Sequence, residues 1–243
     1  MLTAYLKRIR ENGANKIMQV LRFLLLNCFL IAILIAGANE SFAQQQGYDI
    51  SGGGQPTITS GLNGTVTGSG DPTQNLAVTI NFGEVTPANS NKIVKVTVPI
   101  AIRSIQPYQV TATATTSFSA DQRAVQATDI GFGINNMRPL GIKGQQCTRS
   151  THIITPLFNN DPALNMTINT AGRVAYPSTV SNVGSSTLLM SGHKLTQGTS
   201  ISRTAEDGWV FNAVFTIAPS FYASGTFSLT LNFNIAPGPN VQC

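Results

Sequence analysis

The fold class is decided by the stretch FSLTLNFNI, residues 227–235. Apolar and polar residues alternate strictly along it, and its apolar set is Phe227, Leu229, Leu231, Phe233 and Ile235. A period of two predicts a β-strand with one buried face and one solvated face. A looser alternation runs through residues 209–217, and the connector between the two stretches carries Pro219 and Gly225. Such turn-forming residues predict a loop between two antiparallel neighbouring strands.

Further alternating stretches extend this pattern over most of the chain. They cover residues 76–82, 94–102, 108–114 and 130–134, and a shorter apolar run covers residues 187–190. Because proline lacks an N–H, Pro99 predicts an edge strand or a bulge in the second stretch. Residues 141–184 predict short strands and long loops, and no segment carries apolar residues at helical spacing. Strands separated by turn signals every 8 to 12 residues or so are typical of an all-β sandwich or barrel.

The N-terminal segment, residues 1–43, has the features of a secretory signal peptide. Basic residues precede the apolar run Phe23–Ala36, and Ser41-Phe42-Ala43 offers small residues where a signal peptidase reads them. A transmembrane anchor is the alternative, but the run has about 14 residues and a spanning helix needs about 20. We therefore expect cleavage after Ala43 and a secreted, periplasmic or cell-surface protein with no permanent membrane anchor. Translation begins at Met1 or, for a more ordinary signal, at Met18.

Cleavage would leave residues 44–243, about 200 residues, which suffices for one domain with a sizeable core. Residues 44–75 are rich in Gly, Ser, Thr and Gln and predict a flexible arm. The predicted sandwich domain spans residues 76–243 and ends in a Pro- and Gly-containing tail, residues 236–243. The formal net charge of +5 owes much to the basic residues of the leader. No basic patch with interleaved aromatic residues is present, so a nucleic-acid partner is not expected.

The cysteines predict one disulfide bond. Cys28 lies inside the leader, which leaves Cys147 and Cys243 in the exported chain. Two cysteines in an oxidising compartment most simply pair with each other. Closing a loop of about 97 residues would contribute about 4–5 kcal/mol in the chain-entropy model. Because Cys243 is the last residue, the bond would also hold the tail against the domain. Two free thiols or a bond between chains are the alternatives.

Motifs for catalysis or cofactor binding are weak. His152 and His193 are the only histidines, and neither has a second ligand at metal-binding spacing. There is no Gly-x-Ser-x-Gly elbow, and the few acidic residues fit solvated loops better than a glycosidase pair. We therefore expect no enzyme activity, no cofactor and no metal site. Aromatic residues on the strands are expected in the core, whereas Phe221 and Tyr222 in the connector are candidates for exposed, sugar-stacking residues.

Two stretches resemble secreted bacterial pilin-like domains. The first, Asn81-Phe82-Gly83-Glu84-Val85-Thr86-Pro87 with the later Pro107-Tyr108-Gln109-Val110, is similar to the opening of spore-coat-protein-U-type and related chaperone–usher subunits. The second, Ser224-Gly225-Thr226-Phe227 and the strand to Ile235, is similar to their last strand. The resemblance implies an immunoglobulin-like sandwich that lacks one strand. A periplasmic chaperone and then the N-terminal arm of a like subunit would supply that strand.

Carried over by position, the resemblance makes the last strand the assembly edge, lined by Gly225, Phe227, Leu229, Leu231, Phe233 and Ile235. Residues 44–75 would be the donor arm. The tail after residue 235 and the positions of the two cysteines depart from the pattern of these subunits. A tail held by a Cys147–Cys243 bond would cover that edge and complete the domain. The first hypothesis is therefore an exported structural or surface protein of fimbrial type. The alternative is a self-contained binding module, for carbohydrate or another surface ligand, with a complete disulfide-closed sandwich.

Overall fold

The computed structural model describes most of the chain from Gly47 onward. The described residues are 47–59, 64–68, 74–82, 93–117, 121, 124–140, 152–168, 170, 174–196, 201, 203, 207–220, 222 and 227–240. They all belong to one compact unit, Gln46–Cys243. The predicted signal peptide and its cleavage site lie outside them. Within the described ranges, no helix is long and apolar enough to cross a membrane.

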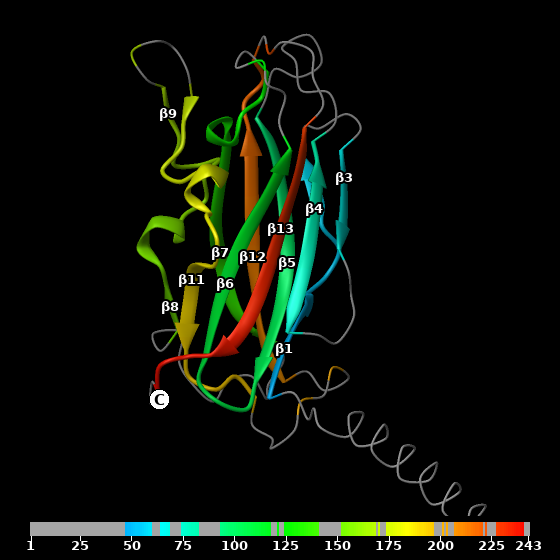
Figure 1. Cartoon of the computed structure of the whole chain (residues 1–243), viewed down its shortest axis with the longest axis vertical. Coiled ribbons are helices and arrows are strands. Elements are labelled where there is room, and N and C mark those ends of the chain that lie inside the picture. Colours follow the sequence, from blue (N-terminus) through cyan, green and yellow to red (C-terminus); the bar gives the residue numbers. More distant parts are fainter. Residues whose placement is uncertain are drawn as a thin grey trace, which may run out of the picture. The chain divides into compact units, whose positions relative to one another are not determined.

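The first of two antiparallel sheets has the strand order β1-β5-β12-β7 (Figure 1), and a further strand, β2, also pairs with β5. Its strands are β1 (Tyr48–Gly52), β2 (Thr57–Thr59), β5 (Val94–Ser104), β7 (Ile130–Leu140) and β12 (Gly208–Ile217). The strand β5 joins the N-terminal β1 and β2 to the later strand β12, so the sheet combines distant parts of the sequence.

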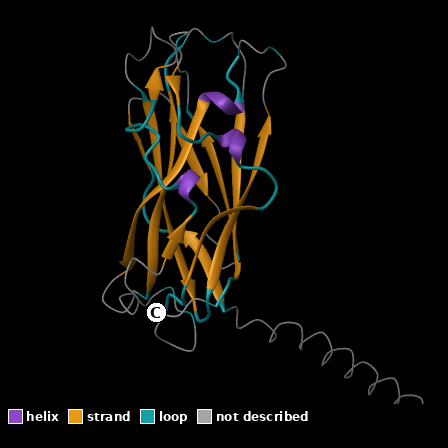
Figure 2. Cartoon of the chain, turned by 90° about the vertical axis from the view of Figure 1, so that its left-hand side faces the viewer, coloured by secondary structure: helices purple, strands orange, loops and turns teal. Residues whose placement is uncertain are grey.

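The second sheet has the order β3-β4-β13-β6-β11-β8. Its strands are β3 (Thr65–Gly68), β4 (Asn75–Asn81), β6 (Tyr108–Ser117), β8 (His152–Ile154), β11 (Thr187–Gly192) and β13 (Ser228–Pro237). A small hairpin of β9 (Thr167–Ile168) and β10 (Val174–Ala175) stands apart from both sheets. The described helical elements are short 3-10 turns, η1 (Ala127–Asp129), η4 (Pro156–Phe158) and η5 (Val180–Asn182), as Figure 2 shows.

The predicted all-β antiparallel sandwich is confirmed. The apolar residues of the alternating stretches lie between the two sheets in one core, and the largest fully buried side chains include Phe132, Phe215 and Phe233. The predicted pairing of β12 with β13 is wrong, because β12 belongs to the first sheet and β13 to the second. Alternation shows which face of a strand is buried but does not name its partner, and both strands face the same core from opposite sides.

The looser alternation of β12 has a structural cause. Its core-facing residues alternate with Val210, Val214 and Thr216, which are also buried. Residues 160–162 and Tyr176 lie against the outer face of this sheet, and two glycines of β7 make room for them. A Cβ on Gly133 would collide with the backbone oxygen of Asn160, and a Cβ on Gly131 would lie 2.7 Å from the Tyr176 ring. The first sheet is therefore covered on both faces.

Pro99 lies in an interior strand, which differs from the predicted edge or bulge. Its carbonyl accepts a hydrogen bond from the N–H of Gly53 on the β1 side of β5. Since the N and C=O of one residue point to the same side of a strand, the missing N–H of Pro99 also faces that side. There β1 pairs with residues 100–104 and β2 with residues 95–97, so Pro99 sits where the neighbouring strand is interrupted. The hydrogen bonds between β5 and β12 therefore need no N–H from Pro99.

The described part of the predicted arm is also different from a flexible tether. Within residues 44–75, β1 and β2 pair with β5, and β3 pairs with β4. Tyr48 and Ile50 of β1 enter the core. The glycines and threonines of this region do not prevent strand formation, because the body of the sandwich supplies the hydrogen-bonding partners and the apolar surface that the segment cannot supply alone.

Candidate functional site

The strand that the resemblance marks as the assembly edge, β13, lies inside its sheet. It pairs with β4 over residues 229–234 and with β6 over residues 228–237. Four of its predicted edge residues are fully buried in the core: Leu229, Leu231, Phe233 and Ile235. Phe227 is partly buried against the same core, and Gly225 lies outside the described residues. Within this chain β13 is therefore not an edge, because β4 occupies the place beside it.

The other predicted site residues are distributed differently from the expectation. Tyr222 is half-buried against the core, and its hydroxyl donates to the carbonyl of Ala218 at 3.3 Å. Phe221 lies outside the described residues, as do Cys147 and Cys243. None of the exposed large hydrophobic side chains of the described residues is aromatic. Tyr222 is therefore not available as a freely standing surface for stacking a sugar.

Exposed apolar side chains gather along one margin of the sandwich. Among the described residues the exposed large hydrophobic side chains all come from one region: Ile153, Leu157, Leu164, Ile168 and Leu188. Leu164 and Ile168 are 79% and 73% exposed. Figure 1 draws the elements that carry or flank them, β8, β9 and β11, along the same side of the molecule. We call these five residues the apolar margin. Exposed apolar side chains that share one side of a protein often belong to an interaction surface.

The apolar margin borders the free edge of the second sheet. The strand β8 pairs with β11, and no described strand pairs with its other side. Thr155 donates its N–H to Leu189 of β11. Because alternate residues direct their N–H and C=O to opposite sides of a strand, the groups of His152 and Ile154 face away from β11. Natural proteins usually protect such edges with charged residues or proline, but β8 contains neither.

The corresponding edge of the first sheet is covered. Phe132 of β7 donates its N–H to the carbonyl of Ser178 at 3.0 Å, and the Ser178 hydroxyl donates to the carbonyl of Phe132. Gly131 and Thr179 form an antiparallel bridge in the same place. The two sheets therefore differ: the segment after β10 caps β7, whereas β8 has no described counterpart.

The segment that carries part of the apolar margin is held by a polar clamp. Phe158 enters the core between the sheets and packs on Phe132, with ring centroids 5.5 Å apart. A few residues later, Asp161 lies on the outer face of the first sheet. Its Oδ2 accepts from Lys95 Nζ at 2.5 Å and from Asn135 Nδ2 at 3.1 Å. Segment 156–162 thus bends around the β7 side of the sandwich with an anchor on each face.

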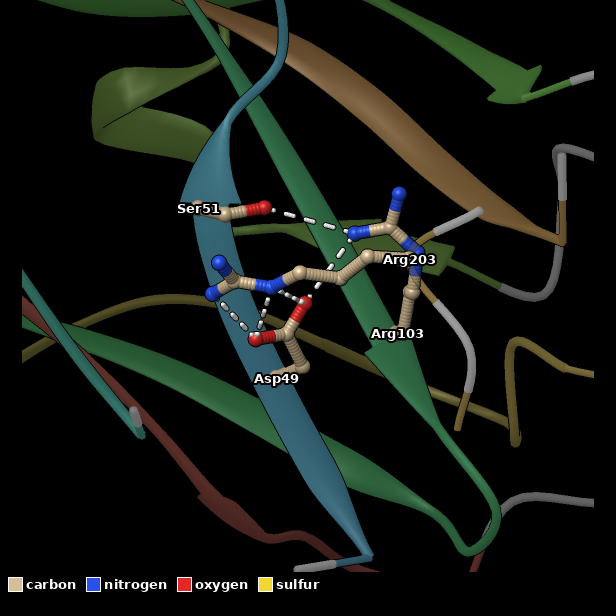
Figure 3. Close-up of polar contacts among 4 residues, drawn as sticks. All are labelled: Asp49, Ser51, Arg103 and Arg203. Carbon is tan, nitrogen blue, oxygen red and sulfur yellow. Dashed lines mark hydrogen bonds and ion pairs between the residues drawn. The ribbon is translucent and has the colours of Figure 1, made fainter. Parts of the chain in front are cut away.

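A second polar cluster attaches the N-terminal strand (Figure 3). Asp49 of β1 and Arg103 of β5 face each other in register and are 4% and 5% exposed. Arg103 Nη1 lies 3.0 Å from Asp49 Oδ2 and 3.3 Å from Ser51 Oγ. Arg203 approaches the same carboxylate, with Nη2 2.7 Å from Asp49 Oδ1. The carboxylate oxygens of Asp49 thus accept hydrogen bonds from two guanidinium groups, and this cluster is suited to fastening β1 to β5.

A buried histidine lies where β8 meets the core. His152 Nδ1 is 3.3 Å from the Tyr108 hydroxyl, and its ring centroid is 4.4 Å from that of Trp209. Its Nε2 is buried without a hydrogen-bond partner. Burial, and then the charge of His193, lower the pKa of His152 to about 4. Burial raises the pKa of the Tyr108 hydroxyl well above its usual range. Neither group is charged at neutral pH, so this cluster packs as part of the core.

We expect acid to weaken the fold through His152. Its pKa is about 6.5 in the unfolded chain and about 4 in the folded one, so the unfolded chain binds more protons between these values. Stability contributed by the neutral ring is complete above pH 6.5 and falls as the pH approaches 4, by at most about 3 kcal/mol. Urea unfolding of the parent and of His152→Gln at pH 7 and pH 4.5 measures this contribution.

The His152→Gln variant should lose less stability than its parent between the two pH values. Comparison of the two proteins is needed because carboxylates also titrate in this range. Asn232→Ser, an exposed change on β13 that touches neither histidine, is the control. An equal loss in the parent and in His152→Gln would contradict the assignment.

Comparison with known proteins finds no match to a protein-family model, to a curated protein or to a solved structure. In the described part of the chain no three His, Cys, Asp or Glu side chains converge as a metal site would require.

Proposed function

We propose that this chain is an exported structural or surface protein, of the bacterial fimbrial-like kind, that acts through sheet edges and surface contacts. The observation that carries the proposal is the apolar margin beside the uncharged free edge of β8. A free strand edge offers backbone hydrogen bonds, and adjoining apolar side chains offer surface to bury, which is what β-strand addition requires. The partners are like subunits or an assembly chaperone.

The placement of the titratable groups supports a structural role. Asp49 is buried between Arg103 and Arg203, and Asp161 is held by Lys95 and Asn135. In both places the carboxylate oxygens already accept hydrogen bonds from the protein. These side chains stabilise the attachment of β1 and of the segment after β8, and so they shape the margin rather than a reaction centre.

The proposal keeps the class suggested by the pilin-like resemblance but moves the contact. The resemblance places assembly at β13, whereas β13 pairs on both sides in this chain. Among the described strands, the outermost ones of the second sheet are β3 and β8. The alternative, a carbohydrate-binding module, relies on exposed aromatic residues and loses support from the half-buried position of Tyr222.

The Cys147–Cys243 bond stays a prediction, and the register of the second sheet is compatible with it. Pro237, Tyr108, Gly192 and His152 lie side by side across β13, β6, β11 and β8. Three strand spacings correspond to about 14 Å. Cys147 precedes His152 by about five residues and Cys243 follows Pro237 by about six, and an extended chain spans about 3.3–3.6 Å per residue. The two chain lengths together exceed the gap.

The proposal is tested by the assembly state of the protein after export to a bacterial periplasm. We expect self-association that rises with concentration in light scattering, or capture by a co-expressed assembly chaperone. Changing Leu164 and Ile168 together to serine should weaken that association at least tenfold, since both are exposed and removing them leaves the core intact. Asn232→Ser, an exposed change on the middle strand β13, is the control. A protein that stays monomeric and binds no chaperone would contradict the proposal.

The mass of the unreduced sample, measured on the same preparation, tests the predicted disulfide. It should be lower by two hydrogen atoms if the bond has formed.

A further inference from the structure

The two outermost described strands of the second sheet, β3 and β8, present the free edges and run in opposite directions. The sheet order is β3-β4-β13-β6-β11-β8, and every neighbouring pair is antiparallel. Five reversals separate β3 from β8. A second copy of the chain, placed beside the first in the same orientation, would therefore present its β3 antiparallel to β8. The alternation of the sheet would continue across the junction.

The faces of the two edge strands also correspond. In β8, Ile154 packs against the core, whereas Ile153 is exposed on the outer face. In β3, Val66 packs against the core, whereas Thr65 and Thr67 are exposed. A junction of β8 with β3 would place Ile154 and Val66 on the inner side and Ile153 beside a threonine on the outer side. Apolar and β-branched cross-strand pairs of this kind stabilise sheets.

Neither edge carries a group that would repel the other. The strand β8 reads His-Ile-Ile and β3 reads Thr-Val-Thr-Gly, with no Lys, Arg, Asp, Glu or Pro in either. His152 is neutral at pH 7 because its pKa lies near 4. Both strands are short, three and four residues, so the backbone contribution is small. The apolar margin beside β8 would supply further buried surface.

We infer that the occupant of the β8 edge is the β3 edge of a second copy of this chain, which joins the copies head to tail. The inference rests on the proposed function and names its partner. Because the two surfaces that meet are different, each joined pair of copies keeps one free edge of each kind. Assembly then continues into an open chain, or into a ring where the rotation between copies closes. The right-handed twist of β-sheets rotates each copy relative to the previous one.

The inference is tested by charge substitutions on the two edges of the full exported chain. Ile153→Glu and Thr67→Lys are each expected to weaken self-association at least tenfold, since each places a lone charge at the junction. The combination of Ile153→Glu with Thr67→Lys in one chain is expected to recover most of the loss, because the two charges would meet across copies. Asn232→Lys, on the outer face of β13, is the control that should leave association unchanged. Circular dichroism and thermal unfolding of every variant confirm that it is folded.

Cysteine cross-linking decides between the possible junctions. We expect a chain carrying both Ile153→Cys and Thr67→Cys to form a ladder of disulfide-linked species under oxidation, and either single substitution to form far less. Strong dimers from Ile153→Cys alone would show β8 meeting β8, which overturns the inference and leaves the proposed function intact. Association that none of these substitutions changes would overturn it in the same way. A protein that is monomeric at every concentration and binds no chaperone overturns both.

Discussion

Replacing Asp49 by alanine is expected to destabilise the sandwich by about 3–5 kcal/mol, the cost of removing one partner from a buried ion pair. Arg103 is almost entirely buried. Without Asp49, its Nη1 would keep only the hydrogen bond to the Ser51 hydroxyl. Its Nε already lacks a hydrogen-bond partner. The variant thus leaves a desolvated guanidinium in the outer layer of the first sheet. Urea unfolding followed by tryptophan fluorescence, with Trp209 as the reporter, measures the loss.

Two further variants separate the charge effect from loss of contact. Ser51→Ala removes the 3.3 Å hydrogen bond that the Arg103 guanidinium donates to the Ser51 hydroxyl but leaves the ion pair with Asp49, and should cost only about 1.5 kcal/mol. Replacing Asp49 by leucine and Arg103 by methionine together removes the two buried charges of the cluster, and such replacements of buried ion pairs are often neutral or stabilising. The third member, Arg203, is 29% exposed and reaches solvent. We therefore expect the double variant to be more stable than Asp49→Ala alone. If the double variant is the less stable one, the buried charge is not the source of the cost.

Replacing Phe158 by alanine is expected to cost about 3–5 kcal/mol, as for other fully buried aromatic residues. Phe158 comes from the turn η4, outside both sheets, and fills the space against Phe132. Its removal opens a cavity at the β7 side of the core and releases the inner anchor of segment 156–162. The exposed part of the apolar margin on that segment should then lose its fixed position, so the variant should also associate more weakly at temperatures where it is still folded.

The neighbouring residue provides a matched control for this prediction. Leu157 is in the same turn but is 44% exposed, so Leu157→Ala should change the stability by no more than about 0.5 kcal/mol. Comparing alanine substitutions at these two adjacent residues thus separates the effect of core packing from the effect of the apolar margin. Similar losses for Phe158→Ala and Leu157→Ala in thermal and urea unfolding would contradict the burial assigned to η4.

The predicted assembly edge on β13 shows what a residue pattern can and cannot predict about a strand. Alternation in residues 227–235 correctly placed Leu229, Leu231, Phe233 and Ile235 on a buried face. It could not show whether the two lateral sides of the strand were paired, because backbone hydrogen bonding leaves no trace in the side-chain pattern. The partner β4 lies some 150 residues away along the chain, and its own pattern, in residues 76–82, is equally compatible with many neighbours.

The polar cluster around Asp49 could not be predicted from the sequence for a related reason. Asp49, Arg103 and Arg203 come from three separate segments, and each of them by itself looks like an ordinary polar residue on the exposed side of a strand or in a loop. One signal was present for Asp49, which stands between Tyr48 and Ile50 in a β-like alternation. The Gly- and Ser-rich composition around it pointed instead to a flexible arm, and tertiary pairing with β5 prevailed over that local tendency.

Side-chain periodicity by itself determined the all-β class, the positions of the main strands and most of the core. Those properties follow from local chemistry, since a strand with one apolar face must bury it whatever its neighbours are. The tertiary structure alone decided which strands became edges, where charged groups were buried and where apolar side chains stayed exposed. Each of these outcomes depends on contacts between segments that are far apart in the sequence. The free energy that selects such a contact arises from the pair of segments and cannot be assigned to either segment alone.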